Sequence, residues 1–342
     1  MARSSQLRAV GGRLLQAVPS IIGVIVVTFV LTRALPGDPA VYFAGPAADE
    51  ASIAEIREDL GLDRPLIEQF WIYCGDLIRG DLGVSISTGQ PVMEELARRL
   101  PASLELTLLA LLFSLAIAIP LGVLAATRPN SWIDHLCRVI VTAGVSLPVF
   151  FTGLFLVYVF YYLLDFAPSP LGRLDIFFLS PPHVTGFYTI DALLIGDLEV
   201  FRAALAQLAL PAITLGLFTL APIARMTRAA MLQTLSSDFV RTARASGLSR
   251  STVLFAYAMR NAMLPILTTL GMVFSFMLGS NVLVETVFAW PGIGSFAIDA
   301  LIVSDYAAVQ GFVLAMALLY LVLNLTIDIL YTVVDPRFGL ES

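Results

Sequence analysis

The stretch Ser236–Pro265, SSDFVRTARASGLSRSTVLFAYAMRNAMLP, decides how this chain is organised. It lies between long apolar runs and carries one acid, Asp238, against four arginines: Arg241, Arg244, Arg250 and Arg260. Membrane proteins concentrate basic residues in the loops that stay in the cytoplasm. The stretch therefore marks the inner face of a membrane protein.

Two short helices are predicted inside this stretch. Asp238 is a preferred type of N-cap residue, and Phe239–Ser246 supplies about two helical turns. Gly247 suits the left-handed position that follows a helix end. Ser249 is placed to cap a second helix that continues to Pro265. A short, sharply bounded helix between two membrane spans indicates an element built for contact.

Composition places the chain among integral membrane proteins. Hydrophobic residues make up 58% and charged residues 13%, and the mean hydropathy is +0.86. The first apolar run, Leu14–Leu31, is too long for a signal-peptide core and lacks a clean cleavage site, so we interpret it as an uncleaved span. Five further runs complete an all-α fold of six predicted transmembrane helices: Ala102–Ala126, Leu136–Leu164, Leu205–Arg225, Ala262–Val287 and Val309–Val334.

The distribution of charge gives one orientation for these spans. The segments 36–101 and 165–205 are rich in acidic residues. Between the last two spans, the only charged residues are two acids, Asp299 and Asp305. The N-terminus and the loop 226–261 are basic. With six spans, both termini and the arginine loop are predicted to lie in the cytoplasm, and the acidic segments outside.

The chain contains no lysine, because all 20 of its basic residues are arginines. A P-loop needs a lysine that reaches the β- and γ-phosphates, so the sequence predicts no ATP site and no enzyme activity here. If the chain takes part in ATP-driven transport, ATP hydrolysis must take place on another polypeptide, and the arginine loop is then the natural docking surface for it. The two cysteines and two histidines form no metal-ligand pattern, and no cofactor is expected.

Several segments, in order along the chain, carry a resemblance to a known family. They begin with Pro36–Pro39 and the Leu60–Leu66 segment LGLDRPL, and they continue through Gly80–Gly83, Arg99–Ser103, Ser146–Pro148, Arg260–Pro265, Glu285–Gly294 (ETVFAWPGIG) and Asp335–Arg337. The whole chain resembles the permease subunits of bacterial ABC importers for dipeptides and oligopeptides. This resemblance implies a type I ABC importer permease fold in the bacterial inner membrane.

The resemblance also assigns a role to the arginine loop. The family's E-A-A-x-x-x-G coupling motif corresponds here to Arg241-Thr242-Ala243 followed by Gly247, so an arginine replaces the glutamate. The residues implied to couple to an ATPase are Asp238, Arg241, Thr242, Ala243, Arg244 and Gly247. On a helix, Val240, Ala243 and Gly247 share one side, and we expect these small residues to approach a partner groove. An interfacial helix that only anchors the inner surface is the alternative.

Candidates for the transport pathway or its gate lie in the last third of the chain. They are Ser275 and Asn281 in the fifth span, and Trp290, Pro291 and Gly292 after it. The segment Val287–Ile298 is expected to be a re-entrant element facing the pathway, or else an outer turn with an interfacial tryptophan. The outer segment 36–101 receives a binding protein or braces the permease, and the sequence leaves both open.

The predicted division of the chain follows from these assignments. Residues 1–35 form a cytoplasmic N-terminus and the first span, 36–101 an extracytoplasmic segment, 102–334 the remaining spans with the coupling loop 226–261, and 335–342 a cytoplasmic tail. The implied partners are a second homologous permease, two cytoplasmic ATP-binding subunits or domains, an extracytoplasmic solute-binding protein and the lipid bilayer, with no nucleic acid.

Two functional classes remain in contest at this stage. The first is a permease subunit that forms a translocation pathway for di- or oligopeptides or related small solutes, such as glutathione or nickel chelates. The second is an ATP-independent secondary transporter or channel, which normally shows membrane-embedded ionisable residues or an inverted repeat. No repeat is evident in the sequence, which favours the first class.

Overall fold

The computed structural model describes residues 18–31, 33, 38–44 and 48–334. The N-terminal arginines, the start of the predicted first span at Leu14 and the predicted tail 335–342 lie outside the described residues. Within the described ranges the chain is helical and forms no β-strand, apart from one isolated bridge between Val84 and Pro91. The all-α prediction is confirmed for this part of the chain.

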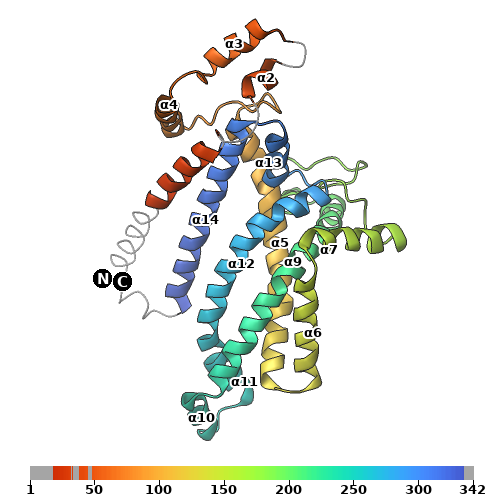
Figure 1. The fold of residues 1–342 in the computed structure, drawn as a ribbon. Helices are drawn as coiled ribbons and strands as arrows, with labels where there is room; N and C mark the ends of the chain where they lie inside the picture. Colours follow the sequence, from red (N-terminus) through yellow and green to blue (C-terminus); the bar gives the residue numbers. More distant parts are fainter. Residues whose placement is uncertain (1–17, 32, 34–37, 45–47, 335–342) are drawn as a thin grey trace.

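The helices follow one another along an elongated molecule (Figure 1). After the apolar helix Val18–Leu31, the elements are α2 (Pro39–Ala44), α3 (Glu50–Asp59), α4 (Leu66–Arg79), α5 (Val92–Thr127), α6 (Trp132–Ser146), α7 (Val149–Leu156), the π-helix η1 (Val157–Leu163), α8 (Tyr188–Leu194), α9 (Leu198–Leu235), α10 (Asp238–Ala245), α11 (Arg250–Thr252), the π-helix η2 (Val253–Met259), α12 (Arg260–Val287), α13 (Ile293–Ile302) and α14 (Tyr306–Val334).

Four of the described helices are long and apolar enough to cross a membrane. They are Val92–Thr127, Leu198–Leu235, the combined helix Arg250–Val287, and Tyr306–Tyr331. The first three each contain a predicted span and extend beyond it by a few turns at one end or both. The fourth belongs to α14 (Tyr306–Val334), which contains the predicted span Val309–Val334 and begins one turn before it. Three shorter apolar helices, Val18–Leu31, Val149–Leu163 and Ile293–Ile302, accompany them.

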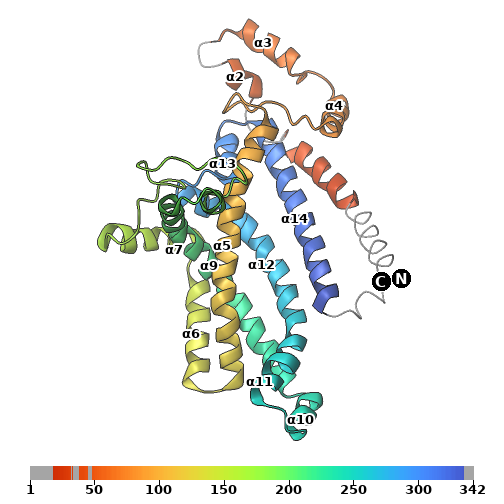
Figure 2. The ribbon, with the colours of Figure 1, turned by 180° about the vertical axis from the view of Figure 1, so that it is seen from behind.

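The predicted third span, Leu136–Leu164, is not a single helix. The chain leaves helical geometry at Leu147, whose φ of −115° and ψ of 143° are extended, and Pro148 starts the next helix. A proline disfavours helical geometry in the residue before it. α6 therefore runs along the bundle, whereas α7 and η1 turn away across its long axis (Figures 1 and 2).

Small residues let α5 and α9 approach closely at the centre of the bundle. A Cβ on Gly216 would lie 2.6 Å from the Phe113 ring and 2.9 Å from the Ala110 carbonyl oxygen. Gly122 is equally confined, since its Cβ would lie 2.7 Å from the Thr227 Cβ. Helices in membranes pack through such small-residue contacts because lipid provides no hydrophobic drive between them.

The two ends of the bundle carry different elements (Figure 1). α10 and α11 form one end, and α2, α3 and α4 lie at the other with α13 below them. α4 is attached to the first apolar helix, because the ring of Phe29 lies 5.3 Å from that of Phe70 and 5.9 Å from that of Tyr73. This contact favours bracing as one role of the outer segment.

Candidate functional site

α10 is the short helix that the sequence of the arginine loop predicts. It spans Asp238–Ala245, and Ser237 occupies its N-cap position without a capping side-chain hydrogen bond. The prediction of Asp238 as N-cap is therefore wrong by one residue. Asp238 instead stands in the first turn, where a negative charge favours the positive end of the helix dipole.

The helix ends as predicted. Gly247 has a φ of +79°, in the left-handed region that glycine enters without strain. Its N–H donates to the Arg244 carbonyl oxygen at 3.0 Å, and the Leu248 N–H donates to that of Ala243 at 3.4 Å. Ser249 then caps the next helix by accepting a hydrogen bond from the Thr252 N–H at 3.2 Å. The prediction that this helix ends at Pro265 is wrong, because the helix continues through Pro265 to Val287.

One side of α10 is used within the chain itself. Val240 and Ala243 are buried, and they pack with Val253 of η2 and Leu235 of α9. The expectation that Val240, Ala243 and Gly247 approach a partner groove is therefore wrong, because two of them already face the chain's own loop. Helical periodicity showed that they share a side but not what that side faces.

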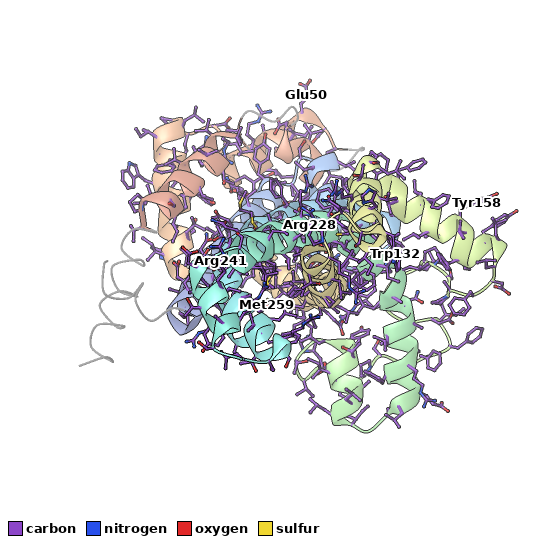
Figure 3. The ribbon with its side chains drawn as sticks, turned by 90° about the horizontal axis from the view of Figure 1, so that it is seen from below. Glu50, Trp132, Tyr158, Arg228, Arg241 and Met259 are labelled. Carbon is purple, nitrogen blue, oxygen red and sulfur yellow. The ribbon has the colours of Figure 1, made fainter. Side chains whose placement is uncertain are left out.

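The outward side of α10 carries the charge. Asp238, Phe239, Arg241, Thr242 and Arg244 are exposed. The Arg241 guanidinium lies 3.2 Å from the Asp238 carboxylate, with 78% and 94% of the two side chains exposed. Such an open pair contributes little to stability. Seen from this end of the bundle, Arg241 lies at the margin of the molecule and Arg228 nearer its middle (Figure 3).

A charge cluster around a buried carboxylate lies between α6 and α9. The Arg228 guanidinium donates to both carboxylate oxygens of Asp134, at 2.6 and 2.9 Å, and Arg138 donates to the same carboxylate at 2.7 Å. Asp134 is buried, so the two arginines provide the compensation that a buried charge needs. This cluster fixes the end of α6 against the helix that leads into α10.

At the opposite end of the bundle, a turn (Phe288–Gly292) connects α12 to α13, and we call it the outer turn after the side of the membrane predicted for it. Ala289 adopts a positive φ of 46°, and the Trp290 N–H donates to the Glu285 carbonyl oxygen at 2.8 Å. The Trp290 side chain is buried, and its indole Nε1–H donates to the Ala102 carbonyl oxygen of α5 at 2.9 Å. The alternative of an interfacial tryptophan is therefore wrong.

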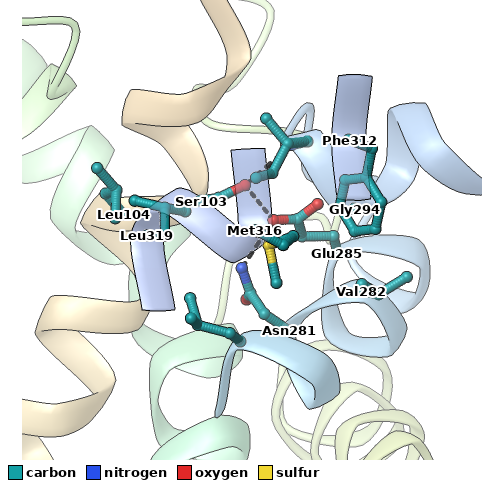
Figure 4. A pocket seen from close by; sticks show the side chains of 11 residues that line it. Ser103, Leu104, Asn281, Val282, Glu285, Gly294, Phe312, Met316 and Leu319 are labelled. Atoms are coloured by element: carbon teal, nitrogen blue, oxygen red, sulfur yellow. Dashed lines mark hydrogen bonds between the residues drawn. The ribbon is translucent and has the colours of Figure 1, made fainter. Parts of the chain in front are cut away.

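Glu285, near the end of α12, lies between Ser103 and Asn281, and dashed lines mark its hydrogen bonds to both (Figure 4). Its fully buried carboxylate accepts hydrogen bonds from the Ser103 hydroxyl of α5, from the Asn281 Nδ2 at 2.8 Å and from the Ser295 N–H at 2.9 Å. The Ser103 hydroxyl in turn accepts from the Ile293 N–H at 2.9 Å. One carboxylate thus joins α5, α12 and the start of α13.

Two glycines allow the chain to pass this close to the carboxylate. A Cβ on Gly294 would lie 2.8 Å from the Glu285 Oε2, and a Cβ on Gly292 would overlap the same group. Beside the turn opens a cavity of about 290 Å³, whose lining includes the exposed Thr286, Pro291 and Asp299 together with the buried Glu285 and Trp290. The turn therefore lies between this cavity and the carboxylate that anchors it.

Sequence comparisons identify the chain. Residues 118–340 match the family model of the binding-protein-dependent transport system inner membrane component, and residues 6–107 match the N-terminal model of the same transport-system membrane components. The chain belongs to this permease family. It is an inner-membrane permease subunit of an ABC importer, as the resemblance implied.

Named relatives match over nearly their whole length. The probable D,D-dipeptide transport system permease protein DdpB of Escherichia coli K12 is 48% identical over 319 residues, which cover 93% of this chain and 94% of the relative. The di/tripeptide transport system permease protein DppB of Pseudomonas aeruginosa is 43% identical, with 97% and 98% covered. The glutathione transport system permease protein GsiC of Shigella flexneri is 36% identical, with 95% and 96% covered.

The permease separates its predicted pathway residues into two groups. Asn281, Trp290 and Gly292 meet around Glu285, and the exposed Pro291 lies on the cavity beside them. Ser275 lies lower on α12 and outside this group, where its hydroxyl donates to the Gly271 carbonyl oxygen at 3.0 Å. That bond satisfies the serine within its own helix and leaves it without a distinctive contact.

Sequence reasoning passed over the residue that organises the outer turn. Glu285 lay within the quoted ETVFAWPGIG segment, but only as part of the resemblance. The signal that singles it out is an acid at the end of an otherwise apolar span, where ionisable groups are costly and carry a role by default. Its partners Ser103 and Ser295 have no sequence signal of their own, because they meet Glu285 only through folding.

Proposed function

We propose that this permease pairs with a second homologous permease to form a translocation pathway for short peptides or related small solutes. A solute-binding protein delivers the solute from outside, and two cytoplasmic ATP-binding subunits drive its import. The names of its relatives support this substrate class, because those names specify transport of D,D-dipeptides, dipeptides, di- and tripeptides, and glutathione. Six spans with both termini in the cytoplasm, and the division of the chain at residues 35, 101 and 334, belong to the same proposal.

The element that couples import to ATP hydrolysis is α10. The single observation that carries this assignment is its division into two sides. Val240 and Ala243 anchor the helix to its own loop. On the opposite side of the helix, Phe239, Arg241 and Arg244 are exposed and free to contact a partner. Arginine forks bind carboxylates with defined geometry, and an exposed aromatic ring offers an anchor for a groove.

The implied coupling residues divide their work on this helix. Arg241 and Arg244 bind the partner, Thr242 ties its hydroxyl to the Asp238 carbonyl oxygen at 3.0 Å, and Ala243 and Gly247 fix how the helix sits and ends. Asp238 keeps Arg241 oriented from one turn away. At the outer end, Asn281, Trp290, Pro291 and Gly292 belong to the gate of the pathway, and Ser275 is a lining candidate lower on α12.

Charge reversal on α10 tests the proposal. Arg241→Glu is expected to leave membrane insertion intact, to release the ATP-binding subunits during purification and to abolish ATP-dependent peptide uptake in proteoliposomes. Arg79→Glu is the matched control, because Arg79 is also 78% exposed and also pairs with an aspartate three residues earlier, on α4 at the other end of the bundle. Loss of uptake in both variants, or in neither, would refute the assignment of α10.

A further inference from the structure

Glu285 is chemically out of place at the end of a membrane-spanning helix. It is fully buried, yet its carboxylate gathers hydrogen bonds from α5, α12 and α13 rather than from solvent. A buried charge costs several kcal/mol to desolvate unless hydrogen bonds compensate it. An apolar residue of similar volume would fill the same space at lower cost, so the carboxylate is present for what it holds.

The carboxylate holds the first turn of α13, which directly follows the outer turn. The Ser295 N–H binds Glu285 directly, and the Ile293 N–H binds the Ser103 hydroxyl that also donates to Glu285. Trp290 adds a separate bond to the Ala102 carbonyl oxygen. The outer turn is therefore fastened on both sides, to α5 and to the end of α12.

The helix that carries Glu285 begins beside α10. Arg250–Val287 is continuous over 38 residues, a length of about 57 Å at 1.5 Å per residue. Val253, near its start, packs on Val240 and Ala243 of α10. One helical rod thus contacts the coupling helix at one end and holds the outer turn at the other. The π-helix η2 lies inside the rod close to α10, and such segments often mark functional positions.

We propose that Glu285 is a positioning residue of the transport cycle, which makes the outer turn and α13 move together with the rod that starts at α10. This inference rests on the proposed function. A displacement of α10 shifts the rod, and the hydrogen bonds of Glu285 oblige the turn to follow. α13 carries the motion outward, because Ile293 and Phe296 pack in one cluster with the outer ends of α5 and α14.

Glu285→Gln tests the role with almost no change of shape. The new amide places an N–H₂ group where the carboxylate accepted hydrogen bonds, so at least one donor from Ser103 or Ser295 loses its acceptor. In proteoliposomes with the ATP-binding subunits and the binding protein, we expect assembly and basal ATP hydrolysis to stay close to wild type. Peptide imported per ATP hydrolysed should fall about tenfold or more, in line with the loss of a charge-assisted hydrogen bond.

Glu105→Gln is the matched control for a purely structural effect. Glu105 is also buried on α5, two residues from Ser103, but its carboxylate binds Arg173, between η1 and α8, and Thr189 of α8. Glu105→Gln should lower the melting temperature while leaving peptide imported per ATP unchanged. An equal loss of import per ATP in both variants would overturn the positioning role.

Trp290 reports directly on the turn. The chain has three tryptophans, and Trp71 and Trp132 are exposed, so Trp71→Phe with Trp132→Phe leaves Trp290 as the sole buried reporter. Adding Glu285→Gln should increase quenching of its fluorescence by acrylamide. Unchanged quenching, or wild-type import per ATP in Glu285→Gln, would overturn the inference. A wild-type complex that imports nothing with ATP would instead refute the proposed function itself.

Discussion

The outer turn and α10, which lie at opposite ends of this permease, treat polar groups in opposite ways. At the outer end, Glu285 and Trp290 are buried and make their hydrogen bonds inside the chain. On α10, the side chains of Arg241 and Asp238 are 78% and 94% exposed and form an ion pair with each other. A buried satisfied group fixes its own chain, whereas an exposed one is available to another chain. This contrast supports our proposal that the outer turn is held within the chain and that α10 docks on a partner.

The largest expected effect comes from unpairing a buried charge near the outer turn. Arg173 donates to the Glu105 carboxylate at 2.6 Å and to the Gly186 carbonyl oxygen at 2.7 Å, and its guanidinium lies 3.6 Å from the centre of the Tyr188 ring. Arg173→Leu should destabilise the permease by about 3–5 kcal/mol, because Glu105 would remain buried without its cation. Denaturant unfolding in detergent measures the change.

Arg138→Leu is the control from the α10 end. Its partner Asp134 keeps both hydrogen bonds from Arg228, and 54% of the Arg138 side chain is exposed. The expected loss is below about 1 kcal/mol. Equal losses for the two variants would remove the contrast between the two ends.

A smaller effect is expected at the end of α10. Gly247 has a positive φ and no neighbour within 4 Å of an added Cβ, so Gly247→Ala introduces backbone strain alone. We expect a cost of about 1 kcal/mol, seen as faster amide exchange at the end of α10 and weaker binding of the ATP-binding subunits. Gly279→Ala on α12 is the control, because it also has open space but an ordinary helical φ. It should be neutral or stabilising.

The exposed pair on α10 should contribute least to stability. A double-mutant cycle of Asp238→Ala and Arg241→Ala is expected to give a coupling energy of about 0.2–0.5 kcal/mol, because both side chains are solvated. The same Arg241→Ala change should strongly weaken binding of the ATP-binding subunits. A coupling energy well above 1 kcal/mol would show instead that the Asp238–Arg241 pair stabilises its own chain, as the buried groups of the outer turn do.

The hydrogen bonds of Asp191, in α8, offer a test by pH. Burial alone would raise the pKa of Asp191, but hydrogen bonds from Thr185 and Gly186 outweigh it and hold the pKa below its ordinary value of 3.8. A carboxyl group whose pKa falls on folding stabilises the fold above its unfolded pKa, and this contribution is lost as the pH falls. Limited proteolysis near Thr185 should therefore accelerate below about pH 4, and Asp191→Asn should abolish that dependence.

The sequence was most informative where local chemistry decides the structure. Gly247 marks the end of α10 and Ser249 the start of α11, because left-handed geometry and capping depend on single residues. It failed at Leu147, where the predicted third span breaks before Pro148. Five other prolines stay inside long helices of this chain, namely Pro101, Pro120, Pro211, Pro222 and Pro265. Only packing decides which proline ends a helix.

The candidate site was predictable at one end and hidden at the other. The residues of α10 are neighbours along the chain, so their spacing indicated a helix, although not that Val240 faces inward. Glu285 and Ser103 are separated by 182 residues, and no local pattern brings them together. Their meeting depends on how α5 packs against α12, which a single sequence does not specify.

Chemical cross-linking from α10 tests the central claim most directly. With Cys74 and Cys137 replaced by serine and alanine, Ala245→Cys carries the only thiol of the permease, at the exposed last residue of α10, and Arg79→Cys provides the control at the last residue of α4. In an assembled complex that imports peptide, Ala245→Cys should cross-link to an ATP-binding subunit and Arg79→Cys should not. An importing complex in which Ala245→Cys gives no such product would contradict the account.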